Sequence, residues 1–160
     1  MRWGWFALAL LLVYVLATAW PHTWLDLLAA FALACALLLP AEDAWLAGWI
    51  TGFSHDLAGH GPIGIHALAL GLAAYGLTRI RDGLNRELWW VRWLGGFVVL
   101  FPAQILVALH QRYIGGQRIP WWQIVTEPAG VALLAALLAA LAAGVPAAIA
   151  RRRRHLATRW

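Results

Sequence analysis

The sequence predicts an all-α integral membrane protein, a bundle of six transmembrane helices with the N- and C-termini in the cytoplasm. The first observation is composition: 63% of the 160 residues are hydrophobic, only 12% are charged and the mean hydropathy is +0.71. Soluble domains carry about 25% charged residues, so a soluble enzyme and a disordered tail are both excluded. The second is a series of apolar runs separated by helix breakers. The third is the presence of twelve tryptophans, which suit membrane–water interfaces.

The first three apolar runs lie in the N-terminal half of the chain. The first follows Arg2 and stops before Pro21, and the second stops at Pro40. The third stops at the Gly-His-Gly-Pro sequence 59–62 and has only 14 residues. A helix needs about 20 residues to cross a bilayer, with about 17 tolerated, so we expect this segment to be a tilted short span or a re-entrant segment.

The last three runs are longer. The fourth ends in the charged stretch 79–87, the fifth at the Gly- and Pro-containing stretch 115–120, and the sixth at the four arginines 151–154. All six belong to one membrane domain, 1–160, which ends in a basic cytoplasmic tail, 150–160. The predicted spans are 3–19, 23–39, 44–57, 63–80, 88–113 and 121–149.

The arginines set the predicted orientation, because short cytoplasmic loops are rich in positive charge. With the N-terminus inside, nine of the twelve arginines fall on the cytoplasmic side and only Arg112 and Arg118 fall outside. The run 151–154 then faces anionic lipid headgroups, an interpretation we prefer to nucleic-acid binding. A rival interpretation makes the first run a cleavable signal peptide ending at Ala17-Thr18-Ala19, which would leave five spans in the same orientation.

The ionisable residues within the predicted spans gather in their outer halves. A charged group in hydrocarbon costs about 2.5 to 3.5 kcal/mol, so each one requires a reason. We predict an outward polar pocket lined by Asp26, Asp56, His66, His110 and Glu127. The alternative is that Asp26 and His110 reach the headgroups from helix ends.

Glu127 precedes Pro128, which frees a backbone carbonyl about one turn upstream. We expect Glu127 to have a buried partner, with Arg112 as the first candidate. A metal site is not expected, since His55, His60 and His66 lack the i, i+4 spacing of two ligands on one helix. A Ser-His-Asp triad at 54–56 is not expected either, because adjacent helical residues point about 100° apart. The sequence predicts no cofactor.

Small residues form matching strips on two neighbouring segments. Gly48, Gly52 and Asp56 follow each other at intervals of four, and Ala67, Gly71 and Ala74 make a second strip. Small residues let helix backbones approach closely in membranes. We therefore expect the segments 44–57 and 63–80 to pack together.

Around these strips the sequence resembles a known family, the bacterial rod shape-determining protein MreD. The matching residues are Gly-Phe-Ser-His-Asp-Leu at 52–57, Pro-Ile-Gly-Ile at 62–65, Ala-Leu-Ala-Leu at 67–70 and Ala-Tyr at 74–75. The resemblance covers about forty residues, from Gly48 to Arg86, and elsewhere only hydropathy, length and the basic C-terminus agree. It implies a multi-pass protein of the bacterial inner membrane.

The resemblance further implies a non-enzymatic subunit of the elongasome, which directs lateral peptidoglycan synthesis and rod cell shape. Such a subunit binds MreC and, through it, MreB, RodA and a transpeptidase. The expected partner-binding residues are Gly48, Gly52, Asp56, Gly64, His66 and Tyr75, and the expected outward pocket holds Asp26, His110, Arg112 and Glu127. The family's architecture also resembles the substrate-binding subunits of energy-coupling-factor vitamin importers, so a small-molecule binder is the alternative.

Overall fold

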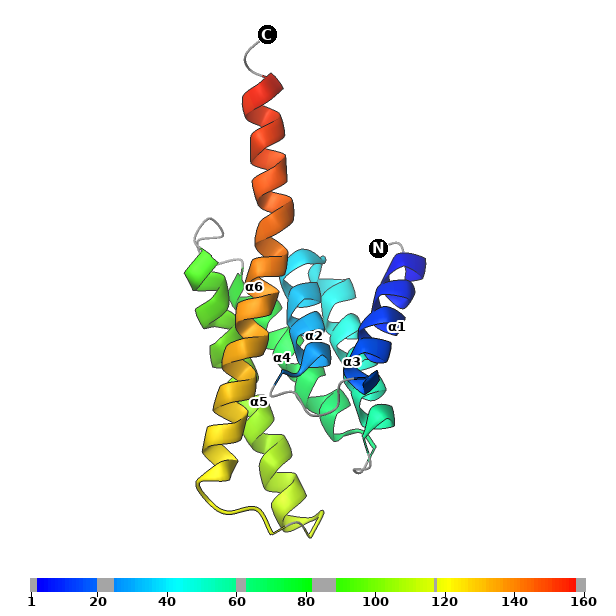
Figure 1. Cartoon of the computed structure of the whole chain (residues 1–160), viewed down its shortest axis with the longest axis vertical. Helices are drawn as coiled ribbons and strands as arrows, with labels where there is room; N and C mark the ends of the chain where they lie inside the picture. The colour runs from blue at the N-terminus through cyan, green and yellow to red at the C-terminus, as the bar shows by residue number, and fades with distance from the viewer. Residues whose placement is uncertain (1–2, 20–24, 60–62, 82–88, 117, 158–160) are drawn as a thin grey trace.

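The protein is all-α, with six helices in the part of the chain that the computed structural model describes. The described residues are 3–19, 25–59, 63–81, 89–116 and 118–157, with side chains up to Gly144. Figure 1 shows the helices running alternately up and down, with both chain ends on the same side of the bundle. The helices are α1 (Trp3–Ala19), α2 (Leu27–Leu38), α3 (Ala41–Ala58), α4 (Ile65–Arg81), α5 (Trp89–Tyr113) and α6 (Gln123–Ala157).

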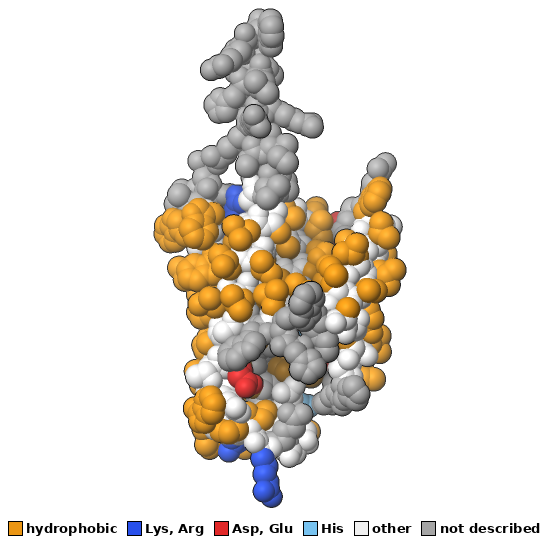
Figure 2. Space-filling model, viewed as in Figure 1, with side chains coloured by type: hydrophobic (Ala, Val, Ile, Leu, Met, Phe, Trp, Pro, Cys, Tyr) orange, Lys and Arg blue, Asp and Glu red, His pale blue; other side chains and the backbone are white. Residues whose placement is uncertain are grey.

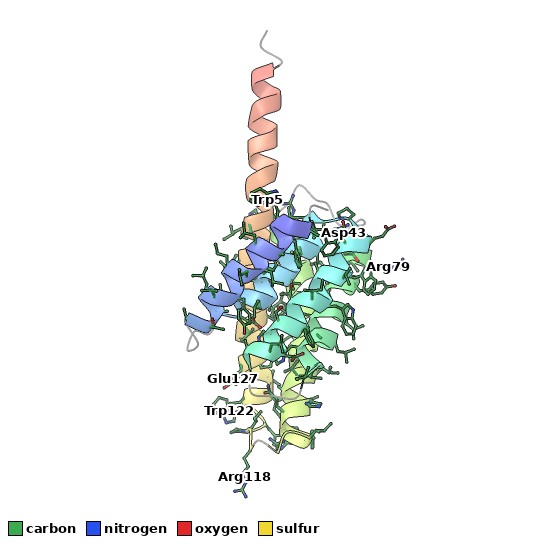
Figure 3. All side chains as sticks on the ribbon, turned by 90° about the vertical axis from the view of Figure 1, so that its right-hand side faces the viewer. Trp5, Asp43, Arg79, Arg118, Trp122 and Glu127 are labelled. Carbon is green, nitrogen blue, oxygen red and sulfur yellow. The ribbon has the colours of Figure 1, made fainter. Side chains whose placement is uncertain are left out.

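The two ends of the bundle differ in how the chain leaves them. Helix α6 extends beyond the bundle at one end, which we call the tail end. Figure 3 places Trp5, Asp43 and Arg79 at this end. The opposite end, where α5 connects to α6, is the hairpin end, and the same view places Arg118, Trp122 and Glu127 there. Both ends thus carry an arginine and an acidic residue.

Helix α2 lies at the centre of the bundle and contacts α1, α3, α4 and α6. The main core joins α2 to α4, α5 and α6 and consists largely of alanines, with Leu33, Leu70, Leu77 and Leu100 as its largest buried side chains. Alanine contacts let helix axes lie close together, which is how helices associate in lipid, where there is little hydrophobic drive between them. Phe6 attaches α1 to the bundle by stacking on Phe31 of α2, with ring centroids 5.7 Å apart.

The predicted close contact of the two small-residue strips is confirmed. A Cβ added to Gly48 would lie 2.6 Å from Ala74 Cβ, and one added to Gly52 would meet the backbone of His66 and Ala67. The indole of Trp49 of α3 packs against Gly71 of α4, where a Cβ would lie 2.6 Å from the ring. Helices α3 and α4 are therefore in backbone contact along their length.

The outer surface of the bundle is apolar. Helix α1 exposes five aliphatic side chains by 49–59%, namely Leu8, Leu11, Leu12, Val15 and Leu16. Figure 2 shows a broad band of hydrophobic side chains across the bundle, with charged side chains toward the lower end. Two of the described helices are long and apolar enough to cross a membrane, α5 and the Gln123–Gly144 part of α6. Only 28% and 39% of their most apolar windows are buried, whereas the core helix of a soluble protein is mostly buried.

Three helices differ from the prediction by more than one residue in length. The short helix is α2, with 12 residues or about 18 Å. Asp26 caps it, so it begins at Leu27, four residues later than expected. Helix α3, which was expected to be the short one, has 18 residues. Helix α3 begins earlier than predicted because Pro40 fixes its entry, and Glu42 and Asp43 suit the positive end of its dipole. Helix α6 continues to Ala157, past the predicted boundary at 149 and through the four arginines.

The α3–α4 contact predicts the effect of a single methyl group. Gly52→Ala forces the two backbones apart, and overpacking of this kind costs about 1–3 kcal/mol. Gly130→Ala in α6 is the matched control, because a Cβ there has nothing within 4 Å and alanine favours helix. Thermal unfolding of the purified protein in detergent should place Gly52→Ala below the wild type and Gly130→Ala at or above it. Equal melting temperatures for the two variants would contradict the described contact.

Candidate functional site

The carboxylate of Asp56 caps the N-terminus of α4 from the neighbouring helix α3. Its Oδ2 accepts hydrogen bonds from the backbone N–H groups of Gly64 (2.8 Å) and Ala67 (3.1 Å), and its Oδ1 accepts from His66 N (3.1 Å). The first N–H groups of a helix lack intrahelical partners, and the residue preceding α4 is Gly64, with φ of 109° and no side chain. Asp56 thus performs the N-cap role from the preceding helix, and its side chain is only 1% exposed.

Asp26 caps α2 in the usual way and joins it to two other helices. Its Oδ1 accepts a hydrogen bond from Ala29 N at 2.8 Å. Its Oδ2 lies 3.2 Å from His55 Nε2 of α3 and accepts from Gln104 Nε2 of α5 at 3.3 Å. The interpretation of Asp26 as a residue reaching the headgroups is therefore replaced by a half-buried carboxylate that ties α2, α3 and α5 together.

Two histidines connect the two carboxylates. His66 Nδ1 lies 2.8 Å from Asp56 Oδ1, and the rings of His55 and His66 stack with centroids 4.0 Å apart and planes inclined by 16°. The order in space is Asp26, His55, His66, Asp56. Each ring has one nitrogen at a carboxylate, and His55 Nδ1 is buried without a hydrogen-bond partner among the described residues.

A cavity of about 460 Å³ lies beside this cluster, toward the hairpin end. Its walls come from α1, the start of α2, the end of α3, the start of α4, α5 and α6. Of the residues predicted for the outward pocket, Asp26, His66 and Glu127 line it. Its polar lining residues are Thr18, Asp26, His55, His66, Gln104, Gln111 and Glu127.

The remaining predicted pocket residues lie elsewhere. Asp56 is buried on the far side of His66, and neither His110 nor Arg112 lines the cavity. The guanidinium of Arg112 donates a hydrogen bond to the carbonyl of Ile119 and lies 4.0 Å from the centre of the Trp121 ring. The expected Arg112–Glu127 pair is therefore wrong: Glu127 is exposed and forms no ion pair with any described residue, because Arg112 is held by the hairpin connection.

The residues predicted to bind a partner fall into two groups. Gly48, Gly52 and Asp56 lie inside the α3–α4 contact, and His66 faces the cavity. Tyr75 alone has a largely exposed side chain, at 47%. Its hydroxyl accepts a hydrogen bond from Arg79 Nη2 at 2.8 Å, and the guanidinium lies 5.0 Å from its ring centre. Partner binding by these six residues stays a prediction.

Sequence reasoning missed His55 and Gln104. The sequence patterns group His55 with Ser54 and Asp56 or with His60 and His66, but it pairs with Asp26, twenty-nine positions earlier. Ser54 donates to Ile50 O. The signal available was an amide at Gln104 inside the predicted fifth span, because a polar group in hydrocarbon needs a partner. His22 and His60 lie outside the described residues. Among those described, no three His, Cys, Asp or Glu side chains are placed to hold a metal ion.

The Asp56 cap predicts a local effect of its removal. Asp56→Ala leaves the N–H groups of Gly64, His66 and Ala67 without an acceptor, and loss of a cap costs about 0.5–2 kcal/mol, more when the donors are buried. We expect a lower unfolding temperature and faster hydrogen exchange confined to the start of α4. Asp56→Asn keeps one acceptor oxygen, so its unfolding temperature should lie between those of the wild type and Asp56→Ala. The control is Glu42→Ala, on the exposed first turn of α3. Unchanged exchange in Asp56→Ala would rule out the capping role.

Comparison with known proteins gives no relative from which a role can be carried over: no protein-family model, no curated protein and no solved structure matches this chain. The function is therefore inferred from the residues and their geometry. The features that bear on the function are the apolar exterior, the α3–α4 pair with its Asp56 cap, and the cavity beside the two histidines.

Proposed function

We propose that the protein is a six-span subunit of the bacterial inner membrane with both termini in the cytoplasm. The exposed apolar side chains of α1 and the lengths of α5 and α6 support this proposal. Helix α2 is too short to cross alone, but it is surrounded by other helices and both of its ends are satisfied by side chains. Asp26 accepts from its first turn, and Arg81 of α4 donates to the carbonyls of Ala36 and Leu39. Backbone polar groups at membrane depth require such internal partners.

The orientation predicts the outcome of topology mapping. Alkaline phosphatase inserted at Gly116, in the hairpin-end connection, should be active because that end faces the periplasm. The same reporter fused after Trp160 should be inactive, while a fluorescent protein fused there should be bright. Activity of the phosphatase at the C-terminus would contradict the proposed orientation.

Within the membrane, we propose the role of a non-enzymatic elongasome subunit that binds MreC. The observation that carries this proposal is the contact made by the residues that resemble the MreD family. Gly52 packs on His66 and Ala67, and Asp56, four residues later, accepts from Gly64. The spacing of these residues thus has one physical explanation, a tightly packed and capped helical hairpin, which supports the interpretation of the pattern as a family feature.

A surface for the partner's single transmembrane helix is available on α4. Leu68, Leu72 and Tyr75 are spaced by four and three residues, so they lie on one helical face, and they are exposed by 39%, 54% and 47%. Gly52 and Asp56 affect this surface indirectly, because they fix α4 against α3. Tyr75 offers both an aromatic ring and a hydroxyl for contact.

Co-purification with MreC from native membranes tests this role. Tyr75→Ala should reduce recovery of MreC at least about fivefold, which corresponds to about 1 kcal/mol, while the variant still inserts and unfolds as the wild type does. Tyr113→Ala at the hairpin end is the matched control, since Tyr113 is also exposed, at 65%. Recovery of MreC that is unchanged in both Tyr75→Ala and Gly52→Leu would remove the proposal.

The alternative, a substrate-binding subunit of a vitamin importer, is favoured by one observation, the cavity of about 460 Å³. Small-molecule sites are concave and hold a few placed polar groups. A thermal-shift screen with vitamins distinguishes the two roles, because only the importer subunit gives a saturable shift with a vitamin.

A further inference from the structure

We propose that the cavity at the hairpin end binds a primary ammonium group, carried by a small amine or by an aminophospholipid headgroup. This inference does not depend on the elongasome role, because a scaffold protein can hold a lipid in such a site. It rests on three properties of the cavity. These are its supply of hydrogen-bond acceptors, its negative charge and its position between α1 and the α5–α6 pair.

The free hydrogen-bonding capacity of the cavity lining is mostly acceptor capacity. Because His55 Nε2 and His66 Nδ1 each lie at a carboxylate, those nitrogens carry the protons in the neutral rings, and the other two ring nitrogens carry lone pairs. Since His55 Nδ1 is buried, the ring acceptor left for a ligand is His66 Nε2. Gln104 donates one of its two Nε2 protons to Asp26, and its carbonyl oxygen has no partner among the described residues. Thr18 donates its hydroxyl proton to the backbone carbonyls of its own helix.

The unused acceptors therefore require a donor-rich ligand. A primary ammonium has three N–H donors, and it can bond several converging acceptors at once. Among the side chains of the described lining, only the amides of Gln104 and Gln111 keep N–H donors that no described interaction occupies. An anionic ligand would face acceptors on nearly every side.

The charges favour the same ligand. Asp26 and Glu127 line the cavity and Asp56 lies behind His66, while no lysine or arginine is found among the described lining residues. The stacked rings of His55 and His66 lie 4.0 Å apart, so repulsion opposes a positive charge on both. At most one imidazolium then faces three carboxylates. An unbalanced negative charge at membrane depth is costly, and a bound cation removes that cost.

The position of the cavity explains why two sources of the ammonium are considered. Apolar residues of α1, α5 and α6 form the rest of its wall, among them Ala17, Val107 and Val131. The cavity is thus lined by the outer helix α1 as well as by the α5–α6 pair. A soluble amine would enter from the hairpin end, and a lipid would place its headgroup there with its chains against the apolar wall.

Two matched probe pairs test the proposal on the full-length protein. In detergent, isothermal titration with ethanolamine is compared with choline, which has the same charge and alcohol but no N–H donor. The protein is also placed in nanodiscs of equal phosphatidylethanolamine and phosphatidylcholine content. Native mass spectrometry then measures which of the two lipids remains bound to the protein after the protein is released from the nanodisc. The two lipids share the phosphate, so any preference reports the ammonium.

We expect a preference of about tenfold or more for the primary ammonium in at least one arm, since charge-assisted hydrogen bonds contribute about 1.5–3 kcal/mol each. A preference confined to ethanolamine assigns a soluble amine, and one confined to phosphatidylethanolamine assigns a lipid. No preference in either arm overturns the proposal.

Variants locate the site. Glu127→Gln should abolish most of the preference, and because Glu127 is exposed and joins no described ion pair, this variant should fold normally. Asp26→Asn, which keeps an acceptor for Ala29, should weaken binding as well. Glu42→Gln, an exposed carboxylate in the first turn of α3 at the tail end, is the control and should leave binding unchanged. A preference that survives both Glu127→Gln and Asp26→Asn also overturns the proposal.

Discussion

The buried carboxylate of Asp56 is the interaction on which the arrangement of the bundle depends. It binds three backbone N–H groups and one imidazole of the next helix. Because these donors belong to the first turn of α4, the cap fixes where α4 begins and how it faces α3. With that start fixed, Gly48 and Gly52 meet the small residues of α4, and His66 comes to lie against His55. The cavity wall is a consequence of the same contact.

Polar groups in this protein are used where the apolar core cannot supply cohesion. The contacts between α2, α4 and α6 are mostly between alanines, which pack closely but have little surface for dispersion. Side-chain hydrogen bonds from one helix to the end of another supply specificity instead. Asp26 and Arg81 satisfy the two ends of α2, and Asp56 satisfies the start of α4. In a medium of low polarity, such pairs fix one register, because any other leaves polar groups without partners.

Much of the architecture could be predicted from the sequence, because the apolar runs and their breakers act locally. The first and fifth helices appear within one residue of the expected bounds, and the small strips of α3 and α4 meet as their spacing indicated. The site was only partly predictable. Asp26, His66 and Glu127 could be assigned to one side from topology. The pairing of His55 with Asp26 depends on how α2 and α3 are rotated, and the engagement of Arg112 by Ile119 depends on a turn. Neither is encoded in the periodicity of a single segment.

Helix α4 has a mechanical property that follows from its two attachments. It is held at its start by the carboxylate from α3, and near its end Arg81 grips the terminal carbonyls of α2. Sliding α4 along its axis by a single residue, about 1.5 Å, would break both attachments together. The helix is therefore a rigid connection of fixed length between the two ends of the bundle. A force that displaces one end of α4 along its axis must therefore move the other end as well, or be resisted by both attachments together.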